Sequence, residues 1–404
     1  MKILYLTFHF EPDLSAGSFR NTALVNELAL QLGSDDEIHV YTTQPNRYKS
    51  YKVTASGYEE RTGPRGCLVK INRVSIPSHN NGLADQIRSF ATYFRLVFYL
   101  NRDKHYDLIL ASSSKLFTAF LGAWLARRKS SRKQSVPLFL DIRDLFRENI
   151  LEMLMYRPFY VQPFRLALKP VLAILERYTF GRAKHINLVS EGFSSYFKPF
   201  SQATYSYCTN GIDDEFLTIP VSAKNTNSHS RTVLYAGNIG EGQGLHKIIP
   251  EAAQRLGNSY RFVVIGDGGA KAKLEQAVRS KGIDNVEIHS STDRNKLLGE
   301  YQKADYLFVH LNDYKAFNLV LPSKLFEYAA TDKPIVAGVA GYAADFIREH
   351  VKNHMLHEPG DVDGLVRLLK ETPYQTQVRP EFARKFQRKA IMPVLVRHII
   401  QTVT

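Results

Sequence analysis

Short hydrophobic runs alternate with stretches of helical periodicity along almost the whole chain. Apolar runs of about 4–8 residues, bounded by turn residues, are typical of buried strands. The helical stretches between them predict α/β layering around parallel sheets. In the first half, the predicted strands are Lys2–Phe8, Glu37–Thr42, Leu68–Val74, Asp107–Ser112, Pro137–Asp141, His185–Ser190 and Thr204–Cys208. The predicted helices there are 18–32, 83–101, 115–129, 163–181 and 191–198.

The alternation stops once, at the polar stretch Ser222–Ser230, which has the composition of a linker. It then restarts with predicted strands Arg231–Ala236, Arg261–Ile265, Val286–His289, Tyr306–His310 and Ile335–Ala337. At 404 residues the chain is longer than one hydrophobic core usually organises. We therefore expect one domain over 1–218, a second over 219–380, and a basic helix over 381–404 that packs back on the first. Ligands of such sheets bind beyond the carboxyl ends of the strands, so a site is expected in a cleft between the domains.

Composition is that of an ordinary globular protein, with 44% hydrophobic and 23% charged residues. The two cysteines, Cys67 and Cys208, argue against a disulfide framework, and a reducing cytosol fits. No Cys/His cluster has zinc spacing, so no metal site is expected. No apolar run approaches the length of a transmembrane helix.

The net charge of +14 is unevenly distributed. Residues 86–198 carry 19 Lys/Arg against 8 Asp/Glu, and residues 379–404 carry 6 against 1. Aromatic and apolar residues are interleaved with the first of these basic regions, which favours an anionic membrane surface as partner. A nucleic-acid partner is not expected, because neither a helix-turn-helix pattern nor a single-strand stacking platform stands out. The alternative is that the aromatics are core residues and the cations a solvated rim. The interleaved residues are Phe90, Tyr93, Phe94, Val97, Phe98, Tyr99, Leu151, Met153, Leu154, Met155, Phe159, Tyr160 and Phe164.

The most informative stretch is Leu321–Ala330. Pro322 and Ser323 are typical of a helix start, where free N–H groups face an anion. Lys324 and Glu327 are three residues apart and so share one helix face. A cation and free amides suit a diphosphate, and a carboxylate can accept two hydrogen bonds from a ribose diol. The alternative is a helix start with an ordinary ion pair.

Three glycine-bearing turns follow predicted strands, at Phe10–Ser18, Gly237–Gly244 and Gly266–Gly269. Glycine lets backbone N–H groups approach a phosphate closely. A dinucleotide oxidoreductase is disfavoured, because the first turn lacks Gly-x-Gly-x-x-Gly and no acidic residue ends the strand at His289. Neither a P-loop nor the Gly-x-Ser-x-Gly elbow of α/β hydrolases is present.

Several of these motifs together resemble the family-4 retaining glycosyltransferases. They are Asn210-Gly211-Ile212-Asp213, Tyr235–Gly240, Val264–Gly268, Ala304-Asp305 and the helix around Glu327, and their order and spacing match along essentially the whole chain. The segments Asp13–Ser18, Asp141–Phe146, Gly237–Gly244 and Pro322–Tyr328 resemble a bacterial subgroup that builds O-antigen or capsule repeat units, including enzymes similar to N-acetylfucosamine transferases. The resemblance implies the GT-B fold: two Rossmann-like domains whose parallel sheets face an interdomain cleft, with the C-terminal helix crossing back.

The resemblance also implies which residues bind the donor nucleotide and its phosphates. These are Gly17, Asn238, Gly240, Gly266, Ser290, Thr292, Pro322, Ser323, Lys324 and Glu327. Glu327 would hold the ribose, the Pro322–Lys324 segment the diphosphate, and the Ser290–Thr292 segment the base. Gly17 would admit the phosphates from the first domain, opposite Asn238 and Gly240.

Three residues are candidates for catalysis. Lys324 would stabilise charge on the leaving diphosphate. Asp144 would orient or deprotonate the acceptor hydroxyl, or else belong to a structural network at the strand end. Arg143 would contact a donor or acceptor phosphate, or else form a surface salt bridge.

The chain departs from the family pattern at two places. Leu319 occupies the position where relatives often carry a glutamate that contacts the donor sugar, and Gln243 and Glu241 stand where the phosphate loop usually has cations. Lys324 is then the obvious replacement cation. The apolar segment Phe317–Leu319 would suit a deoxy or N-acetylated sugar.

The expected protein is a bacterial, cytoplasmic glycosyltransferase, peripheral on the inner face of the cytoplasmic membrane. It would move a sugar from a UDP-sugar to a polyprenyl-diphosphate-linked saccharide with retention, and need neither metal nor cofactor. A UDP-sugar epimerase of similar architecture would instead turn over without an acceptor. A non-catalytic nucleotide-sugar-binding protein would bind the donor without turnover.

Overall fold

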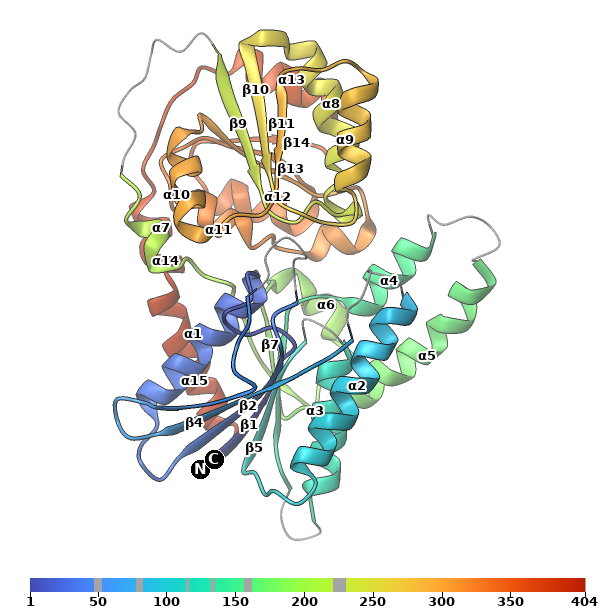
Figure 1. The fold of residues 1–404 in the computed structure, drawn as a ribbon, viewed down its shortest axis with the longest axis vertical. Helices are drawn as coiled ribbons and strands as arrows, with labels where there is room; N and C mark the ends of the chain where they lie inside the picture. The colour runs from blue at the N-terminus through green and yellow to red at the C-terminus, as the bar shows by residue number, and fades with distance from the viewer. Residues whose placement is uncertain are drawn as a thin grey trace. The chain divides into compact units, whose positions relative to one another are not determined.

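The computed structural model describes residues 1–46, 53–77, 83–113, 116–131, 135–155, 162–220 and 230–403. The chain divides into two compact units, each with its own sheet covered by helices (Figure 1). Unit 1 comprises Met1–Asn210 with Ile391–Thr404, and unit 2 comprises Gly211–Ala390. The predicted linker before Ser230, and Phe159 and Tyr160 of the basic region, lie outside the described residues.

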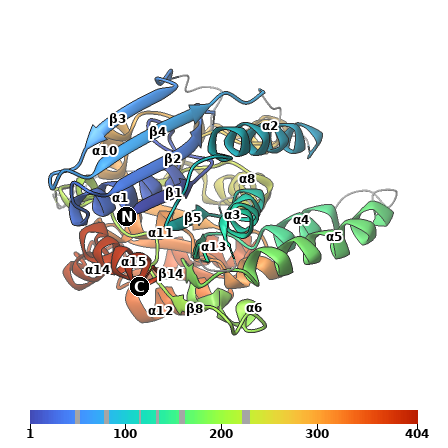
Figure 2. The ribbon, with the colours of Figure 1, turned by 90° about the horizontal axis from the view of Figure 1, so that it is seen from below.

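Unit 1 is built on an eight-stranded sheet in the order β3-β4-β2-β1-β5-β6-β7-β8. The central strands are mostly apolar on both faces, and all their residues except Lys2 are buried, as expected of a parallel sheet with helices on each side. Figures 1 and 2 show α1 and α15 on one side of this sheet and α2 and α3 on the other. The strands are β1 (Lys2–Leu6), β2 (Glu37–Thr43), β3 (Tyr58–Thr62), β4 (Leu68–Val74), β5 (Leu108–Ser112), β6 (Leu138–Ile142), β7 (His185–Leu188) and β8 (Thr204–Ser206). The helices are α1 (Ala16–Gln31), α2 (Leu83–Asn101), α3 (Leu116–Lys129), α4 (Phe146–Met155), α5 (Gln162–Phe180), α6 (Ser194–Phe197) and the C-terminal α15 (Arg388–Gln401).

Unit 2 is built on a six-stranded parallel sheet in the order β11-β10-β9-β12-β13-β14. Its core lies where α8 and α13 pack on the sheet, around residues such as Ile248, Val264 and Leu365. The strands are β9 (Arg231–Ala236), β10 (Tyr260–Ile265), β11 (Val286–His289), β12 (Tyr306–His310), β13 (Ile335–Gly338) and β14 (His354–His357). The helices are α7 (Asp214–Leu217), α8 (Leu245–Leu256), α9 (Lys271–Ser280), α10 (Arg294–Lys303), α11 (Lys324–Ala329), α12 (Gly341–His350), α13 (Val362–Glu371) and α14 (Pro380–Phe386).

Each sheet has a topological switch point, where consecutive crossovers run to opposite sides. In unit 1 it lies between β1 and β5, because β2 follows β1 on the other side of that strand, and in unit 2 it lies between β9 and β12 for the same reason. Open α/β sheets bind ligands just outside the carboxyl ends of the strands at such a point. The loops after β1 and β9 are therefore where each unit is built to hold a ligand.

The C-terminal helix belongs to both units in sequence. Its residues from Ile391 onward are part of unit 1, where the His398 ring stacks on His185 of β7 with ring centroids 5.2 Å apart. The predicted crossing back of the C-terminal helix is confirmed. The predicted single helix is broken at Gln387, whose extended backbone separates α14 from α15.

Several other elements were not predicted, among them β3, α4 and β14. β3 is an edge strand that pairs with β4 antiparallel, so the sheet of unit 1 is not purely parallel. Its sequence YEERT lacks an apolar run because the strand is largely exposed. β14 is only four residues long, and α4 follows β6 at once. None of the described helices has the length and hydropathy needed to cross a membrane.

Candidate functional site

The switch point of unit 2 is formed by two glycine turns that pack directly on each other. Gly237 follows β9 and Gly266 follows β10, with φ angles of 159° and 154°. A Cβ on Gly266 would lie 1.8 Å from the Gly237 carbonyl oxygen, and a Cβ on Gly268 would lie 2.4 Å from that of Ile239. The Ile239 N–H donates to the Asp267 carbonyl at 2.9 Å. Gly266 was predicted to bind the donor, but its contacts also give it a structural role.

Gln243 closes the first of these turns from inside. Its Oε1 accepts hydrogen bonds from Asn238 Nδ2 at 2.9 Å and from the Gly240 N–H at 3.1 Å. Gln243 thus holds Asn238 and Gly240 together. That these two residues line one wall of a donor site stays a prediction. Gln243 stands where the family resemblance led us to expect a cation, and here it orders the loop instead.

Lys324 and Glu327 form an ion pair beside this turn. Lys324 Nζ lies 2.9 Å from Glu327 Oε2, and the buried Tyr301 donates its hydroxyl to the same oxygen at 2.9 Å. Burial and the nearby Glu327 charge raise the pKa of Tyr301 well above its ordinary value, so the hydroxyl keeps its proton. The Lys324 side chain also packs against Gly237, whose Cβ would lie 3.1 Å from Lys324 Cε. The Lys324 ammonium group, the Glu327 carboxylate and the turn at Gly237 therefore lie together at the switch point of unit 2.

The start of α11 differs from the prediction. The helix begins at Lys324 and has six residues, so Pro322 precedes it rather than lying in its first turn. The Ser323 side chain makes no capping hydrogen bond, while the Pro322 carbonyl accepts from the Leu325 N–H at 3.1 Å. A helix this short contributes little dipole, so positive charge at this place comes mainly from Lys324.

The predicted base-binding segment lies after β11. Ser290 Oγ accepts from Lys271 Nζ at 3.1 Å, and the Ser291 N–H donates to Asp267 Oδ2 at 3.2 Å. Lys271 also pairs with Asp267 Oδ1 at 3.1 Å. Sequence reasoning missed Lys271 and Tyr301. The spacing of Asp267 and Lys271 at the start of α9 was a usable signal, whereas nothing local marked Tyr301.

The predicted apolar wall touches the same loop. A Cβ on Gly242 would lie 2.8 Å from Phe317 Cζ, so the Phe317 ring packs on the Gly237–Gly244 turn. Thr292, also predicted to bind the nucleotide, is partly buried in the segment before α10.

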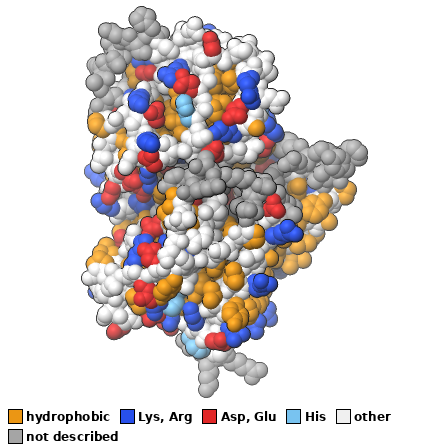
Figure 3. Space-filling model, in the orientation of Figure 1, with side chains coloured by type: hydrophobic (Ala, Val, Ile, Leu, Met, Phe, Trp, Pro, Cys, Tyr) orange, Lys and Arg blue, Asp and Glu red, His pale blue; other side chains and the backbone are white. Residues whose placement is uncertain are grey.

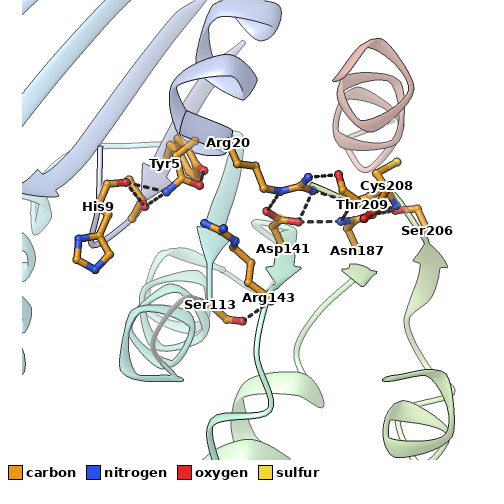
Figure 4. Close-up of polar contacts among 12 residues, drawn as sticks. Tyr5, His9, Arg20, Ser113, Asp141, Arg143, Asn187, Ser206, Cys208 and Thr209 are labelled. Atoms are coloured by element: carbon orange, nitrogen blue, oxygen red, sulfur yellow. Dashed lines mark hydrogen bonds and ion pairs between the residues drawn. The ribbon is translucent and has the colours of Figure 1, made fainter. Parts of the chain in front are cut away.

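In unit 1, the Asp141–Phe146 motif begins in β6, and its residues differ in surroundings. Asp141 is buried and belongs to a network of hydrogen bonds, whereas Asp144 is exposed. Asp141 accepts from Arg20 Nε and Nη2, both at 2.9 Å, and from Asn187 Nδ2 at 2.7 Å (Figure 4). Burial opposes the Asp141 charge, but Arg20 outweighs it and lowers the pKa of this carboxyl. Arg20 also donates to the Cys208 and Thr209 carbonyls, so this pair ties α1, β6, β7 and the end of β8 together.

Arg143 and Asp144, the two predicted catalytic residues of unit 1, differ in surroundings. The Asp144 side chain is exposed and accepts from Asn149 Nδ2 at 3.4 Å. The Arg143 guanidinium points inward toward Tyr5 (Figure 4), and its Nη1 would lie 2.7 Å from a Cβ on Gly17. The predicted residues Gly17 and Arg143 are therefore adjacent. That residues of unit 1 and unit 2 bind the same ligand stays a prediction.

Among the described residues, no group of three or more His, Cys, Asp or Glu side chains is placed to hold a metal ion.

Comparison with solved structures identifies the fold. Two solved structures share the fold along nearly the whole chain: sucrose-phosphate synthase from Thermosynechococcus elongatus (TM-score 0.73, 13% identity, covering 99% of this chain and 98% of that one), and Anabaena HepE in complex with UDP and glucose (TM-score 0.62, 15% identity, 99% of each). The predicted GT-B fold is confirmed.

Part of the chain also matches a family by sequence. Residues 221–389, which lie within unit 2, match the family model of glycosyl transferases group 1. The chain is also 29% identical over 163 residues to Escherichia coli (strain K12) WcaI, which is named as a colanic acid biosynthesis glycosyl transferase. That match covers 39% of this chain and spans 40% of the relative's length.

Proposed function

We propose that this protein is a retaining glycosyltransferase that moves a sugar from a UDP-sugar to a polyprenyl-diphosphate-linked saccharide during synthesis of a bacterial surface polysaccharide such as O-antigen or capsule. The observation that carries the proposal is the cluster of Lys324, Glu327 and Tyr301 against the Gly237 turn. It lies at the switch point of unit 2, which contains the segment that matches glycosyl transferases group 1.

The cluster suits the ribose and diphosphate of a nucleotide. Tyr301 and Lys324 both contact Oε2 of Glu327, which orients the carboxylate and leaves Oε1 for a ribose hydroxyl. A diphosphate would compete with Glu327 for Lys324, which then stabilises the charge that grows on the leaving group. The bound UDP in the Anabaena structure of the same fold favours uridine as the base.

Retention needs no nucleophile from the protein in this scheme. The bond from the sugar C1 to the diphosphate breaks while the acceptor oxygen bonds to the same face, and the acceptor proton passes to the departing phosphate. Asp144, exposed after β6, would orient the acceptor hydroxyl. No metal is required, so transfer should persist after chelation.

A surface of unit 1 supports a lipid-linked acceptor. On α5, several large apolar side chains face solvent, and Arg165, Lys169 and Arg177 accompany them. Figures 1 and 3 show the pair α4–α5 extending from unit 1 with hydrophobic side chains along it. Exposed apolar groups beside cations favour the interface of an anionic bilayer. The exposed apolar residues of α5 are Phe164, Leu166, Val171 and Ile174.

Membrane binding is tested by sedimentation with anionic vesicles. Leu166→Glu with Ile174→Glu should reduce adsorption by about 10-fold or more, because each places a charge where apolar area enters the interface. Val394→Glu, at an exposed position on α15, is the matched control and should adsorb normally. Equal adsorption of all three proteins would remove the membrane from the proposal.

The function itself is tested with nucleotide sugars. UDP and UDP-sugars should raise the melting temperature while GDP and ADP do not, because a ligand bound only by the folded state stabilises it. N-acetylated and deoxy sugars should be preferred if the Phe317 wall contacts the sugar. Transfer to lipid extracts should release UDP only when acceptor is present. Sugar epimerisation without acceptor would identify an epimerase, and binding without turnover a non-catalytic protein.

A further inference from the structure

His310 is the last residue of β12, beside the switch point of unit 2, and its side chain is buried. Its Nδ1 lies 2.6 Å from the Gln243 carbonyl oxygen, and its Nε2 lies 2.9 Å from the Gly360 amide nitrogen. A carbonyl only accepts hydrogen bonds and an N–H only donates them, so Nδ1 carries the proton and Nε2 is the acceptor. Burial lowers the pKa of His310 to about 4, so the ring is neutral near pH 7, as both contacts require.

Neighbouring residues hold the His310 ring in this orientation. The rings of Phe308 and His357 lie near it, with centroids 5.9 and 6.1 Å away and interplanar angles of 27° and 25°. Gly338 of β13 is the register partner of His310, and a Cβ there would lie 2.3 Å from His310 Cδ2. Only a glycine therefore leaves room for the ring. The imidazole directs its donor toward the Gly237–Gly244 turn and its acceptor toward the loop before α13.

Asn312, two residues further along the chain, binds the neighbouring peptide groups of the same turn. Its N–H donates to the Gly242 carbonyl at 2.7 Å, and its Nδ2 donates to the Glu241 carbonyl at 3.1 Å. Lys247 Nζ lies 3.4 Å from Asn312 Oδ1, which orients the side-chain amide. Together with His310, the end of β12 thus engages three successive carbonyl groups of the turn.

The composition of the turn makes this support important. The sequence of the Gly237–Gly244 turn contains four glycines and no lysine or arginine. A bound diphosphate therefore gains no ion pair from the turn, and the turn can contribute only its shape and its backbone groups. Glycine-rich backbone has many alternative conformations, which it must lose when a ligand binds. A turn that is ordered beforehand does not subtract this cost from the binding free energy.

We propose that His310 is a positioning residue which, together with Asn312, orders the Gly237–Gly244 turn before the donor nucleotide binds. The inference rests on the proposed function, in which this turn is part of the nucleotide site, and it adds residues that act on the nucleotide indirectly. His310 acts through the Gln243 carbonyl. Its contact with Gly360 holds the ring on the side away from the turn.

Two substitutions separate the two hydrogen bonds of the ring. His310→Asn places an amide nitrogen where the imidazole has Nδ1, and so keeps a donor for Gln243. His310→Gln reaches the place of Nε2, so it keeps an acceptor for Gly360 but removes the donor to Gln243. Both variants lose the packing of the ring, so their melting temperatures should fall by similar amounts. A purely structural role of His310 would affect the two variants alike.

UDP binding, measured by calorimetry, distinguishes the two roles. His310→Gln should bind UDP about fivefold or more weakly than the parent protein, because only the fraction of molecules with an ordered turn is competent to bind. His310→Asn should stay within about twofold of the parent, because its turn remains ordered. A UDP affinity that falls equally in both variants, or in neither, overturns the proposal.

Hydrogen exchange of the unliganded proteins gives a reading that does not depend on UDP. The N–H groups of Gly240, Gln243 and Gly244 are bonded within the turn, so they should exchange slowly while it is ordered. Exchange there should be about fivefold or more faster in His310→Gln than in the parent and in His310→Asn. A parent protein that binds no UDP contradicts the proposed function. Unchanged exchange in His310→Gln contradicts the role of His310, whatever the turn binds.

Asn312→Ala serves if the His310 variants do not fold. It keeps the backbone hydrogen bond to Gly242 and removes the one to the Glu241 carbonyl, so exchange should be faster and UDP binding weaker. Asn258→Ala, at an exposed position before β10, is the matched control and should behave like the parent. Exchange and affinity in Asn312→Ala equal to those of this control would overturn the proposal.

Discussion

The two switch points have the same topology but opposite polar chemistry. In unit 2 the cation Lys324 already has a partner, Glu327, and the turn beside it is closed by Gln243. In unit 1 the buried Nε and Nη1 atoms of Arg143 make no hydrogen bond with a described residue, while the Arg20 guanidinium beside it is fully engaged. The sheet topology thus determines where a ligand can bind. The pairing of the cations determines whether the ligand has to supply a hydrogen-bond acceptor to them or to compete with one that is already present.

The largest effect should come from breaking the engaged pair of unit 1. Arg20→Leu leaves Asp141 buried without its cation, which should cost about 3–5 kcal/mol of unfolding free energy. Denaturant unfolding measures it. Arg95→Gln, at an exposed arginine of α2, should stay within about 0.5 kcal/mol of the parent. An Arg20→Leu protein as stable as this control would show that the pair is not structural.

Two glycines sharpen the account of the unit 2 turn. Gly266→Ala should cost about 3 kcal/mol or more, because its Cβ would lie 1.8 Å from the Gly237 carbonyl at a φ of 154°. Gly269→Ala meets no atom within 4 Å and should be nearly neutral. Circular dichroism melts of both variants measure the contrast, and equal melting temperatures would mean that the two turns do not pack as described.

The lysine of unit 2 should matter for turnover more than for stability. Lys324→Ala should reduce turnover by about 100-fold, the loss typical of one group that stabilises transition-state charge. It should leave the melting temperature nearly unchanged, because the ion pair is partly exposed. Initial rates at saturating donor give the comparison. Normal turnover would exclude the role.

The smallest effect concerns pH. Glu176 of α5 accepts from Tyr196 at 2.6 Å and pairs with Arg147, yet burial raises its pKa from 4.5 to about 7. The folded state therefore binds this proton more tightly than the unfolded state does. The contribution of Glu176 to the free energy of unfolding is therefore fully present below its pKa in the unfolded state and is lost as the pH rises through its pKa in the folded state. Stability should fall by about 2 kcal/mol between about pH 5 and pH 8.

Glu176→Gln should remove this part of the pH dependence. Its unfolding free energy, relative to the parent protein, should increase with pH over the same range. Other groups, such as His185, whose pKa burial lowers to about 4, are present in both proteins and cancel in the difference. A difference independent of pH would contradict the raised pKa.

Much of the fold could be predicted because its strands are buried. The apolar runs of β4, β9, β11 and β12 were predicted with their observed bounds. β3 was missed because an exposed edge strand needs no apolar run, and its pairing with β4 depends on residues distant in sequence.

The candidate site was predictable where motif and geometry coincide. The adjacency of Lys324 and Glu327 follows from helical spacing alone. Tyr301 could not be found, because only the packing of α10 against α11 brings it to Glu327. Likewise the sequence motif Asp141–Asp144 does not reveal that Asp141 pairs with Arg20, while Nε and Nη1 of Arg143 make no hydrogen bond with a described residue.

The most direct test of the central claim is a calorimetric titration of UDP into the parent protein and Glu327→Gln. If the carboxylate beside Lys324 and Tyr301 holds the ribose, the variant should bind UDP about 10-fold or more weakly while melting at the same temperature. Equal affinity in the two proteins, or no UDP binding by the parent, would contradict the assignment of the nucleotide to this cluster.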